Sequence, residues 1–421
     1  MLSRFCAACR SKLAFRGLSS VYNPWSMIEE GPLDMNKATT AAYKADKDPR
    51  KINLGEGIYK DDNGKPFVLP VIRQAEKILF EMAPHHEYAP MQGIESFNKT
   101  CQEFAFGPEN PALKEKRVAT VQVLSGTGAL RIGGEFLHKF VPSSTPVYIT
   151  KPTWVNHRGV FVESGLDVRD FRWYDYKNNS LDLAGCLEDL AAAPRGSIIV
   201  LHACAHNPTG VDPSLEQWKQ ISDVIKTRKH IVFFDNAYQG YASGDPDRDG
   251  EGFRLFVQEG HKCIVGCSFA KNMGLYGERV GALHVVCENA EERVNVESQL
   301  KIVIRPLWSN PPLYGARLVD LVLSRPELKK QWFLDVNVMA TRIRAMRERL
   351  ASELSKISSR NWDHIVSQIG MFSFTGLKEA ETWEIRRKWH VYMNPTGRIS
   401  MSGVNTKNVD YLAKAIHDVT K

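Results

Sequence analysis

Residues 263–281 read Cys-Ile-Val-Gly-Cys-Ser-Phe-Ala-Lys-Asn-Met-Gly-Leu-Tyr-Gly-Glu-Arg-Val-Gly. A short apolar run, suited to a buried strand, leads directly into Ser268 and Lys271, and Arg279 follows after a glycine-containing turn. Desolvation lowers the pKa of a lysine at the end of a buried strand, so that its amine can form an imine with a carbonyl compound. Ser268 and Arg279 would offer a hydroxyl and a guanidinium to a phosphate. Ser-x-x-Lys is also a common tetrapeptide, and an ordinary turn is the alternative on this segment alone.

The region around this stretch alternates short apolar runs with helical patterns. Helices are expected at 215–227 and 253–259, and strands at 118–124, 147–150, 168–171, 197–203, 230–235, 263–269 and 280–286. This alternation predicts an α/β fold with a largely parallel, buried sheet and helices on both faces. Ligands of such sheets bind beyond the carboxyl ends of the strands.

Polar residues follow the ends of several expected strands. Asp235 at a strand end suits a pyridine nitrogen that must stay protonated. Tyr238 and Asn207 are the donors expected for a phenolate oxygen, and Trp154 offers a flat face for ring stacking. The alternatives are plain structural roles: a turn cap for Asp235, core filling for Trp154, a turn start for Asn207. Their joint occurrence with Lys271 favours a cofactor site.

A second motif favours phosphate binding. Ser125, Gly126 and Thr127 follow the strand expected at 118–124 and precede a helical pattern. Free backbone N–H groups and the helix dipole converge at such a turn and form an anion cradle. The motif is not a Walker sequence, because the lysine and the spacing are missing. Gly55 and Gly57 lie in another segment whose backbone can approach a ligand closely.

Composition limits the class of protein. The 421 residues are 43% hydrophobic and 24% charged, and the formal net charge is +7. The basic residues are spread along the chain, with acidic residues between them. We therefore expect a globular enzyme of two domains that binds no nucleic acid. No apolar run approaches the ~18 residues of a membrane span. The eight cysteines read as reduced thiols, and Cys6 and Cys9 lack the partners of a zinc site, so no metal is expected.

The N-terminus predicts targeting. The first 28 residues contain basic and hydroxyl residues but no acidic residue before Glu29. This composition is typical of a mitochondrial transit peptide, which we place at residues 1–20, and it predicts the mitochondrial matrix as the location. A disordered basic tail is the alternative.

The last third of the chain suggests how two domains join. A helix is expected at 294–304, a long helix with alternating charge runs from about 332 to 354, and a terminal helix starts at Lys407. The long helix is expected to bridge the domains. We divide the chain into an N-terminal arm with the first part of a small domain (21–66), a large cofactor-binding domain (67–338) and the remainder of the small domain (339–421).

From about residue 25 to its end the chain resembles the class I aminotransferases of fold type I, in particular the branch that acts on aspartate. The resemblance rests on the motifs at 53–59, 61–70, 124–131, 206–210, 234–240, 268–279, 308–312 and 397–401. It implies a large domain with a mainly parallel seven-stranded sheet flanked by helices and a smaller α/β domain built from both chain ends. It also implies a homodimer with shared active sites. The implied reaction is pyridoxal 5'-phosphate-dependent exchange of the amino group of aspartate with 2-oxoglutarate, giving oxaloacetate and glutamate.

The resemblance also implies a role for each site residue. Lys271 would carry the cofactor as an imine and move a proton, and Asp235, with His157 behind it, would pair with the ring nitrogen. Arg398 would bind the substrate α-carboxylate, and Arg305 of a second subunit the distal carboxylate. Further cofactor contacts would come from Ser125, Gly126, Thr127, Trp154, Asn207, Tyr238, Ser268, Arg279 and, from the second subunit, Tyr88; further substrate contacts from Gly57, Trp154 and Asn207.

Two positions depart from the family pattern: Glu56 and Asn36 stand where apolar residues are usual. A carboxylate near the substrate would disfavour a dicarboxylate, unless Glu56 faces solvent or pairs with a neighbouring lysine. A broader aminotransferase that also accepts aromatic amino acids is therefore an alternative. A catalytically silent protein that acts by binding, for example to lipid, is another, although the complete set of Lys271, Asp235 and Arg398 opposes it.

Overall fold

The computed structural model describes residues 23–31 and 34–421, with the side chain of Asn36 excepted. The expected transit peptide at 1–20, together with Cys6 and Cys9, lies outside the described residues, and so does the Asn36 side chain. The six cysteines that the structure does describe are all buried and unpaired, as expected.

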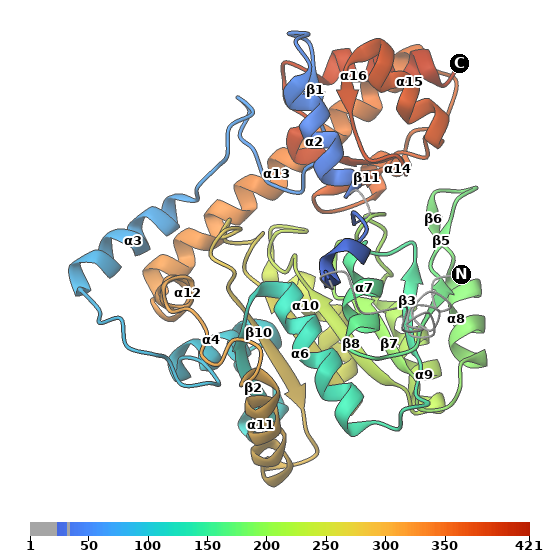
Figure 1. Ribbon diagram of the computed structural model, residues 1–421. Helices are drawn as coiled ribbons and strands as arrows, with labels where there is room; N and C mark the ends of the chain where they lie inside the picture. The colour runs from blue at the N-terminus through green and yellow to red at the C-terminus, as the bar shows by residue number, and fades with distance from the viewer. Residues whose placement is uncertain (1–22, 32–33) are drawn as a thin grey trace.

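A seven-stranded sheet forms the centre of the larger domain (Figure 1). All its pairings are parallel except those of β10, which runs antiparallel to both neighbours. The strand order is β2 (Val118–Val123), β10 (Gly281–Val286), β9 (Cys263–Ser268), β8 (Ile231–Asn236), β7 (Ile198–His202), β3 (Val147–Lys151) and β4 (Val168–Arg172). The mainly parallel α/β sheet expected from the sequence is confirmed.

Helices cover both faces of this sheet, because neighbouring strand residues point to opposite sides. Phe233 packs in the core on one side and Phe234 in the core on the other. The first side is covered by α6 (Ser125–Phe140), α7 (Asn156–Glu163) and α11 (Ala290–Ile304), the second by α8 (Leu183–Ala192), α9 (Leu215–Arg228) and α10 (Pro246–Gln258). Burial on both faces explains why the inner strands β7, β8 and β9 read as continuous apolar runs, whereas the edge strand β4 is largely exposed.

The smaller domain joins the two ends of the chain. Its strands are β1 (Ile52–Asn53), which pairs in parallel with β12 (Val391–Tyr392), and β11 (Phe372–Phe374), antiparallel to β13 (Arg398–Ser400). Its helices are α2 (Met35–Ala45), α14 (His364–Ser367), α15 (Glu379–Trp389), η2 (Met401–Gly403) and α16 (Val409–Val419). The remaining elements are η1 (Pro24–Met27), α3 (Pro70–Met82), α4 (Glu95–Phe106), α5 (Pro111–Lys114), β5 (Tyr174–Asp175), β6 (Ser180–Leu181) and α12 (Tyr314–Ser324).

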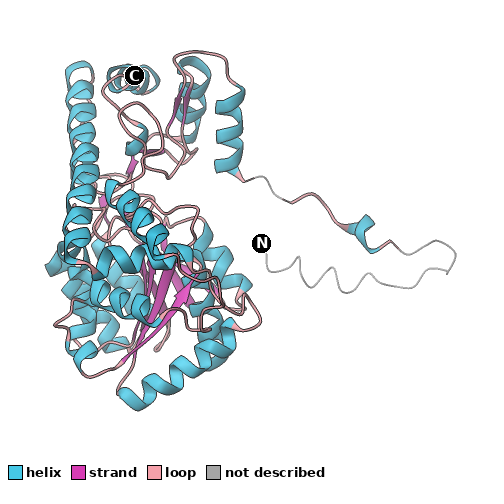
Figure 2. Cartoon of the chain, turned by 90° about the vertical axis from the view of Figure 1, so that its left-hand side faces the viewer, coloured by secondary structure: helices cyan, strands magenta, loops and turns pink. Residues whose placement is uncertain are grey.

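One long helix links the two domains. Figure 2 shows α13 (Pro326–Ile357) running along the side of both. It begins six residues before the start expected from the sequence, because Pro326 suits the first turn of a helix, where its missing N–H is not needed. Helix α10 also starts earlier than expected, since the Asp245 side chain accepts from the backbone N–H groups of Asp247 and Arg248.

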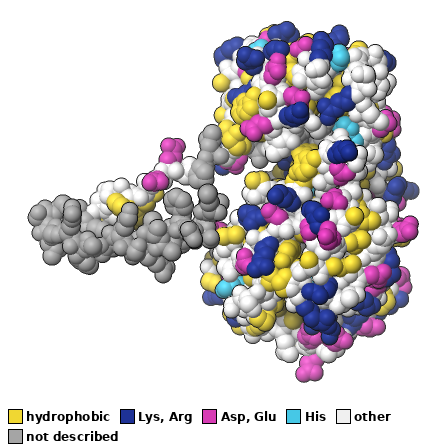
Figure 3. Space-filling view, turned by 90° about the vertical axis from the view of Figure 1, so that its right-hand side faces the viewer, with side chains coloured by type: hydrophobic (Ala, Val, Ile, Leu, Met, Phe, Trp, Pro, Cys, Tyr) yellow, Lys and Arg dark blue, Asp and Glu magenta, His cyan; other side chains and the backbone are white. Residues whose placement is uncertain are grey.

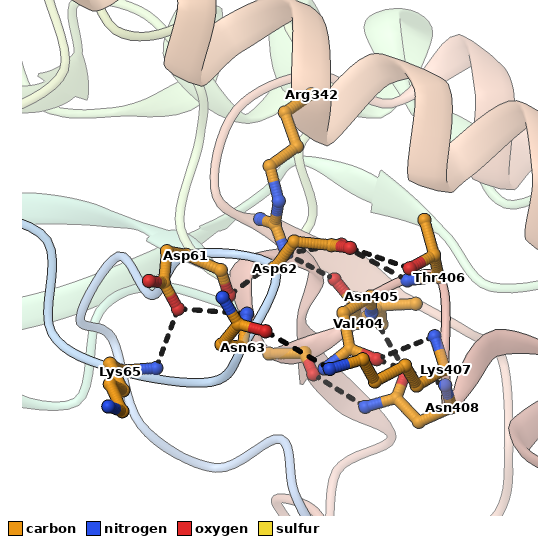
Figure 4. Close-up of polar contacts among 11 residues, drawn as sticks. Asp61, Asp62, Asn63, Lys65, Arg342, Val404, Asn405, Thr406, Lys407 and Asn408 are labelled. Atoms are coloured by element: carbon orange, nitrogen blue, oxygen red, sulfur yellow. Dashed lines mark hydrogen bonds and ion pairs between the residues drawn. The ribbon is translucent and has the colours of Figure 1, made fainter.

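The segment after β1 is fastened to the C-terminal part of the chain (Figure 4). Thr406 Oγ1 donates to Asp62 Oδ2 at 2.6 Å, and Lys407 Nζ donates to Asn63 Oδ1 at 3.0 Å. From α13, Arg342 Nη2 donates to the Val404 carbonyl at 2.9 Å. These contacts hold the segment that contains Gly55 and Gly57 against the rest of the smaller domain.

The surface shown in Figure 3 carries both signs of charge, with Lys and Arg interspersed among Asp and Glu. Such a mixture gives no extended field of one sign on this face. Within the described ranges, none of the helices combines the length and the apolar character that crossing a membrane requires.

Candidate active site

A cavity of about 670 Å³ lies between the two domains, beyond the carboxyl ends of β7, β8 and β9. Its lining includes twelve of the residues expected to form the site: Gly57, Ser125, Gly126, Thr127, Trp154, Asn207, Asp235, Tyr238, Ser268, Lys271, Arg279 and Arg398. Parallel strands place their following loops at one edge of the sheet, which explains how segments so far apart in sequence meet here.

Lys271 lies just after β9, and its amine reaches the smaller domain. Nζ donates to the Gly57 carbonyl and lies 4.8 Å from the centre of the Tyr276 ring. Burial, together with the charges of Arg398 and Arg279, lowers the pKa of the Lys271 amine to about 8. A larger fraction of this amine than of an ordinary lysine is therefore neutral, and nucleophilic, near neutral pH.

Asp235 is held by a buried histidine. His157 Nε2 donates to Asp235 Oδ2 at 3.0 Å, and His157 Nδ1 is hydrogen-bonded to Thr153 Oγ1 at 2.7 Å. Both side chains are buried, and His157 comes from the first turn of α7. The carboxylate is thus oriented and kept at the floor of the cavity.

The start of α6 forms an anion cradle. Ser125 has a φ of 60°, and its Oγ is hydrogen-bonded to Ser268 Oγ at 2.9 Å. A Cβ added to Gly281 would lie 2.9 Å from Ser125 Cα, so this glycine allows β10 to pass the turn. Arg279 lies beside the cradle with its side chain exposed and donates to the Tyr276 carbonyl at 3.2 Å.

On the side of the smaller domain, Arg398 closes the cavity. Its guanidinium lies 4.2 Å from the centre of the Phe372 ring, and Nη2 donates to the Gly55 carbonyl at 3.1 Å. Nη1 donates to Asn207 Oδ1 at 3.4 Å, which links the two domains across the site. Burial lowers the pKa of Arg398, yet its ordinary value is high enough to keep the side chain cationic.

Two aromatic side chains complete the walls. Tyr238 is buried, and burial, followed by the Asp235 charge, raises the pKa of its hydroxyl, which therefore remains a hydrogen-bond donor. Trp154 contacts the His157 ring edge to face, with centroids 5.5 Å apart.

Two expected residues, Tyr88 and Arg305, do not line this cavity in the described chain. Tyr88 is 88% exposed. Arg305 lies at the end of α11, and its Nη1 donates to Ser309 Oγ at 2.8 Å. A single subunit therefore brings neither side chain into the site.

Glu56 is at the rim of the cavity, paired with Lys60. The distance between Glu56 Oε2 and Lys60 Nζ is 2.9 Å, and Thr40 Oγ1 donates to Glu56 Oε1 at 3.4 Å. The lysine opposes the effect of burial and lowers the pKa of Glu56, so the carboxylate is charged and already partnered. Of the sequence alternatives, pairing with a lysine is the one that the structure shows.

Several lining residues were not among the site residues expected from the sequence. Ile58, His202, Tyr276 and Phe372 reach the cavity, and α2 contributes Lys37, Thr40, Ala41 and Lys44. The residues from α2 belong to no motif. Whether they reach the cavity depends on which side of the helix faces the larger domain, and the sequence alone does not show this.

The sequence matches the family described as aminotransferase class I and II over residues 49–416. The chain belongs to this family. It is 49% identical over 407 residues to the mitochondrial aspartate aminotransferase of Dictyostelium discoideum, covering 96% of this chain and 95% of that one. It is 50% identical over 398 residues to the protein of the same name from Gallus gallus, covering 94% of each.

Solved structures agree on the fold. A mitochondrial aspartate aminotransferase from Trypanosoma brucei has a TM-score of 0.89 and 44% identity, covering 91% of this chain and all of that one. An aromatic-amino-acid aminotransferase from Burkholderia pseudomallei, covalently bound to pyridoxal phosphate, has a TM-score of 0.93 and 40% identity, covering 95% of this chain and all of that one.

The cofactor of this family is pyridoxal phosphate, and the cavity has the chemistry to hold it. A buried amine suits its aldehyde, and a carboxylate at the cavity floor suits its ring nitrogen. The two hydroxyls and the helix start at Ser125 suit its phosphate. A Cβ added to Gly126 would lie 3.5 Å from Ser268 Cβ, in the space of that cradle.

Proposed function

We propose that the protein exchanges the amino group of L-aspartate with 2-oxoglutarate, giving oxaloacetate and L-glutamate. The observation that carries the proposal is that the Lys271 amine, the Asp235 carboxylate and the Arg398 guanidinium line one cavity. The names of the relatives that are about half identical over nearly the whole chain support it.

Lys271 holds the cofactor and moves a proton. When bound, pyridoxal phosphate supplies an electron sink that stabilises negative charge at the substrate α-carbon. Once the amino acid has displaced it, the neutral Lys271 amine would take the proton from the substrate α-carbon and pass it to the cofactor, and it would move a proton the opposite way when the oxo acid is aminated. The Asp235 carboxylate, which His157 orients, would stabilise a positive charge on the ring nitrogen of the cofactor.

The remaining side chains fix the cofactor. Trp154 would stack on the ring, and Asn207 and Tyr238 would donate to its phenolic oxygen. Ser125, Gly126, Thr127, Ser268 and Arg279 would hold the phosphate, with Tyr88 of the partner subunit. The 88% exposure of Tyr88 in one subunit supports a place at a subunit interface.

Two arginines orient a dicarboxylate substrate. Arg398 binds the α-carboxylate in a fork, near Gly57, Trp154 and Asn207, and Arg305 of the partner subunit binds the distal carboxylate. Fixing both ends places the α-carbon beside Lys271. The active unit is therefore a homodimer with shared sites.

We assign the domains by the bounds that the sequence predicts, with residues 21–66 and 339–421 in the smaller domain and 67–338 in the larger. Pairing of β1 with β12 supports this division. The location is the mitochondrial matrix, which the names of the relatives support.

A second candidate is a broader aminotransferase that also accepts aromatic amino acids. It is favoured by structural neighbours that are named aromatic or broad-specificity aminotransferases, with TM-scores of 0.90 to 0.93. Both candidates would use the same catalytic residues.

Assays of the purified holoenzyme with 2-oxoglutarate separate the candidates. We expect the specificity constant for aspartate to exceed that for phenylalanine by at least tenfold; similar constants would establish the broader enzyme. Failure of aspartate to shift the cofactor absorbance band would reject both and favour a silent binding protein.

A further inference from the structure

Helix α2 turns one side toward the cavity. Lys37, Thr40, Ala41 and Lys44 line it, and their spacing of three, one and three residues places them on the same face of the helix. Neither lysine belongs to a motif, and no acidic residue occurs in α2.

The opposite side of α2 fixes this orientation. Thr39 is buried, and a Cβ added to Gly55 would lie 3.4 Å from its Cγ2. The Tyr43 ring contacts the Tyr392 ring edge to face, with centroids 5.7 Å apart. Because this side packs against β1 and β12, the lysine side must face the cavity mouth.

Within the part of the chain that the structure describes, the two ammonium groups have no partner. Across residues 23–31 and 34–421, neither Lys37 Nζ nor Lys44 Nζ has a hydrogen bond or an ion pair. Asp34 precedes α2, where its carboxylate accepts from the Lys37 backbone N–H at 3.2 Å, and it does not line the cavity.

The acidic residues of the cavity are already partnered. Asp235 is bound to His157 at the floor, and Glu56 to Lys60 at the rim. Lys271, Arg279 and Arg398 add positive charge deeper inside. The mouth and the interior therefore both attract anions.

We propose that Lys37 and Lys44 form a cationic rim that draws dicarboxylate substrates into the site and so adds to selectivity for acidic over aromatic amino acids. The proposal rests on the proposed function, whose substrates are dicarboxylates. Seven residues along a helix separate the two lysines by roughly 10 Å along its axis, so their charges are spread along the mouth of the cavity rather than gathered at one point. The lysines act through the field at the mouth rather than as a clamp.

A field has a signature that a contact lacks: its effect grows with substrate charge and vanishes in salt. At neutral pH, 2-oxoglutarate carries two negative charges, aspartate one net charge and phenylalanine none. If the rim raises the specificity constant for aspartate by about threefold at low ionic strength, it raises that for 2-oxoglutarate by about ninefold and leaves phenylalanine unchanged.

The test compares K37M/K44M with K47M in the holoenzyme. Lys47 is exposed, lies two residues beyond α2 and does not line the cavity, so K47M removes a nearby charge without touching the rim. Specificity constants for the three substrates are measured at ionic strengths of about 0.01 M and about 1 M, where the screening length falls from about 30 Å to about 3 Å. Calorimetry with succinate, which has no amino group to transfer, measures dianion binding independently of turnover.

We expect K37M/K44M to lose activity in the graded order of substrate charge at low salt, to bind succinate more weakly, and to match K47M at high salt. The proposal would be overturned if K37M/K44M lost equal parts of its specificity constants for phenylalanine and aspartate, or if it behaved like K47M at low salt. If the parent enzyme failed to use aspartate, the proposed function would fall, whereas succinate binding would still decide the inference about the rim.

Discussion

His157 Nε2 donates to Asp235 Oδ2 at 3.0 Å, so a histidine from α7 orients a carboxylate near the end of β8. Thr153 holds the other ring nitrogen of His157, and the three side chains form a chain of hydrogen bonds beneath the cavity. Asp235 is thereby held in one position, which an electrostatic role at a ring nitrogen requires.

Replacing Asp235 with asparagine keeps the shape but removes the charge. We expect the turnover number for aspartate to fall by about 10² to 10⁴-fold, with the cofactor retained through Lys271 and the phosphate cradle. Stopped-flow absorbance measures the rate, and phosphate analysis measures occupancy. Full occupancy with an unchanged rate would contradict the assigned role.

Lys271→Ala should abolish transamination, because the only group assigned to move the α-proton is lost. Cofactor binding should weaken but remain measurable, since Ser125, Ser268 and Asp235 are untouched. Equilibrium dialysis with pyridoxal phosphate provides that measurement. Turnover of aspartate near the parent rate would show that another base does the chemistry.

Arg305→Leu tests the distal carboxylate site. Loss of one partner of a buried charged pair costs about 2 to 5 kcal/mol, so the specificity constant for aspartate should fall by roughly 30-fold to several thousand-fold. Phenylalanine has no distal charge and should be affected far less. Equal losses for both substrates would reject the assignment to Arg305 of the partner subunit.

Glu56→Gln tests how far the paired carboxylate still offsets the positive charge of the rim. The structure pairs Glu56 with Lys60, so the variant leaves Lys60 without its partner and adds positive charge at the rim. The specificity constant for aspartate should rise by about twofold at low salt, with no change for phenylalanine. A matched Lys60→Met variant should have the opposite effect, and a change in the same direction in both variants would contradict a role for charge at this part of the rim.

The lowered pKa of Lys271 predicts a pH dependence. Burial, followed by Arg398 and Arg279, lowers the pKa from 10.5 to about 8. The neutral amine is the nucleophile, so uptake of pyridoxal phosphate by the cofactor-free protein should quicken as pH rises and level off above about pH 8. Between these two pKa values the unfolded chain binds more protons, so this group makes folding more favourable as pH rises. A rate that kept rising to about pH 10 would contradict the lowered pKa.

Much of the fold could be predicted because its signals are local. The inner strands of the central sheet, such as β8 and β9, are buried on both faces and therefore read as apolar runs, and polar residues follow their ends. Asp235, Lys271 and the Ser125 turn were predictable for this reason. The antiparallel direction of β10 and the early start of α10 could not be predicted in this way. The spacing of hydrophobic residues shows neither the direction in which a strand pairs nor the side chain that caps a helix.

The sequence by itself determined the chemistry of the site: a lysine, an aspartate and a hydroxyl-rich turn, each after a strand, where backbone geometry brings strand ends together. Only the tertiary structure decided what approaches them from the other domain. The Gly57 carbonyl meets the Lys271 amine across 214 positions of the chain, and Arg398 meets the Gly55 carbonyl across 343. It also decided that the lysines of α2 face the cavity. Such long-range contacts depend on how whole domains pack, and no local pattern of residues encodes that packing.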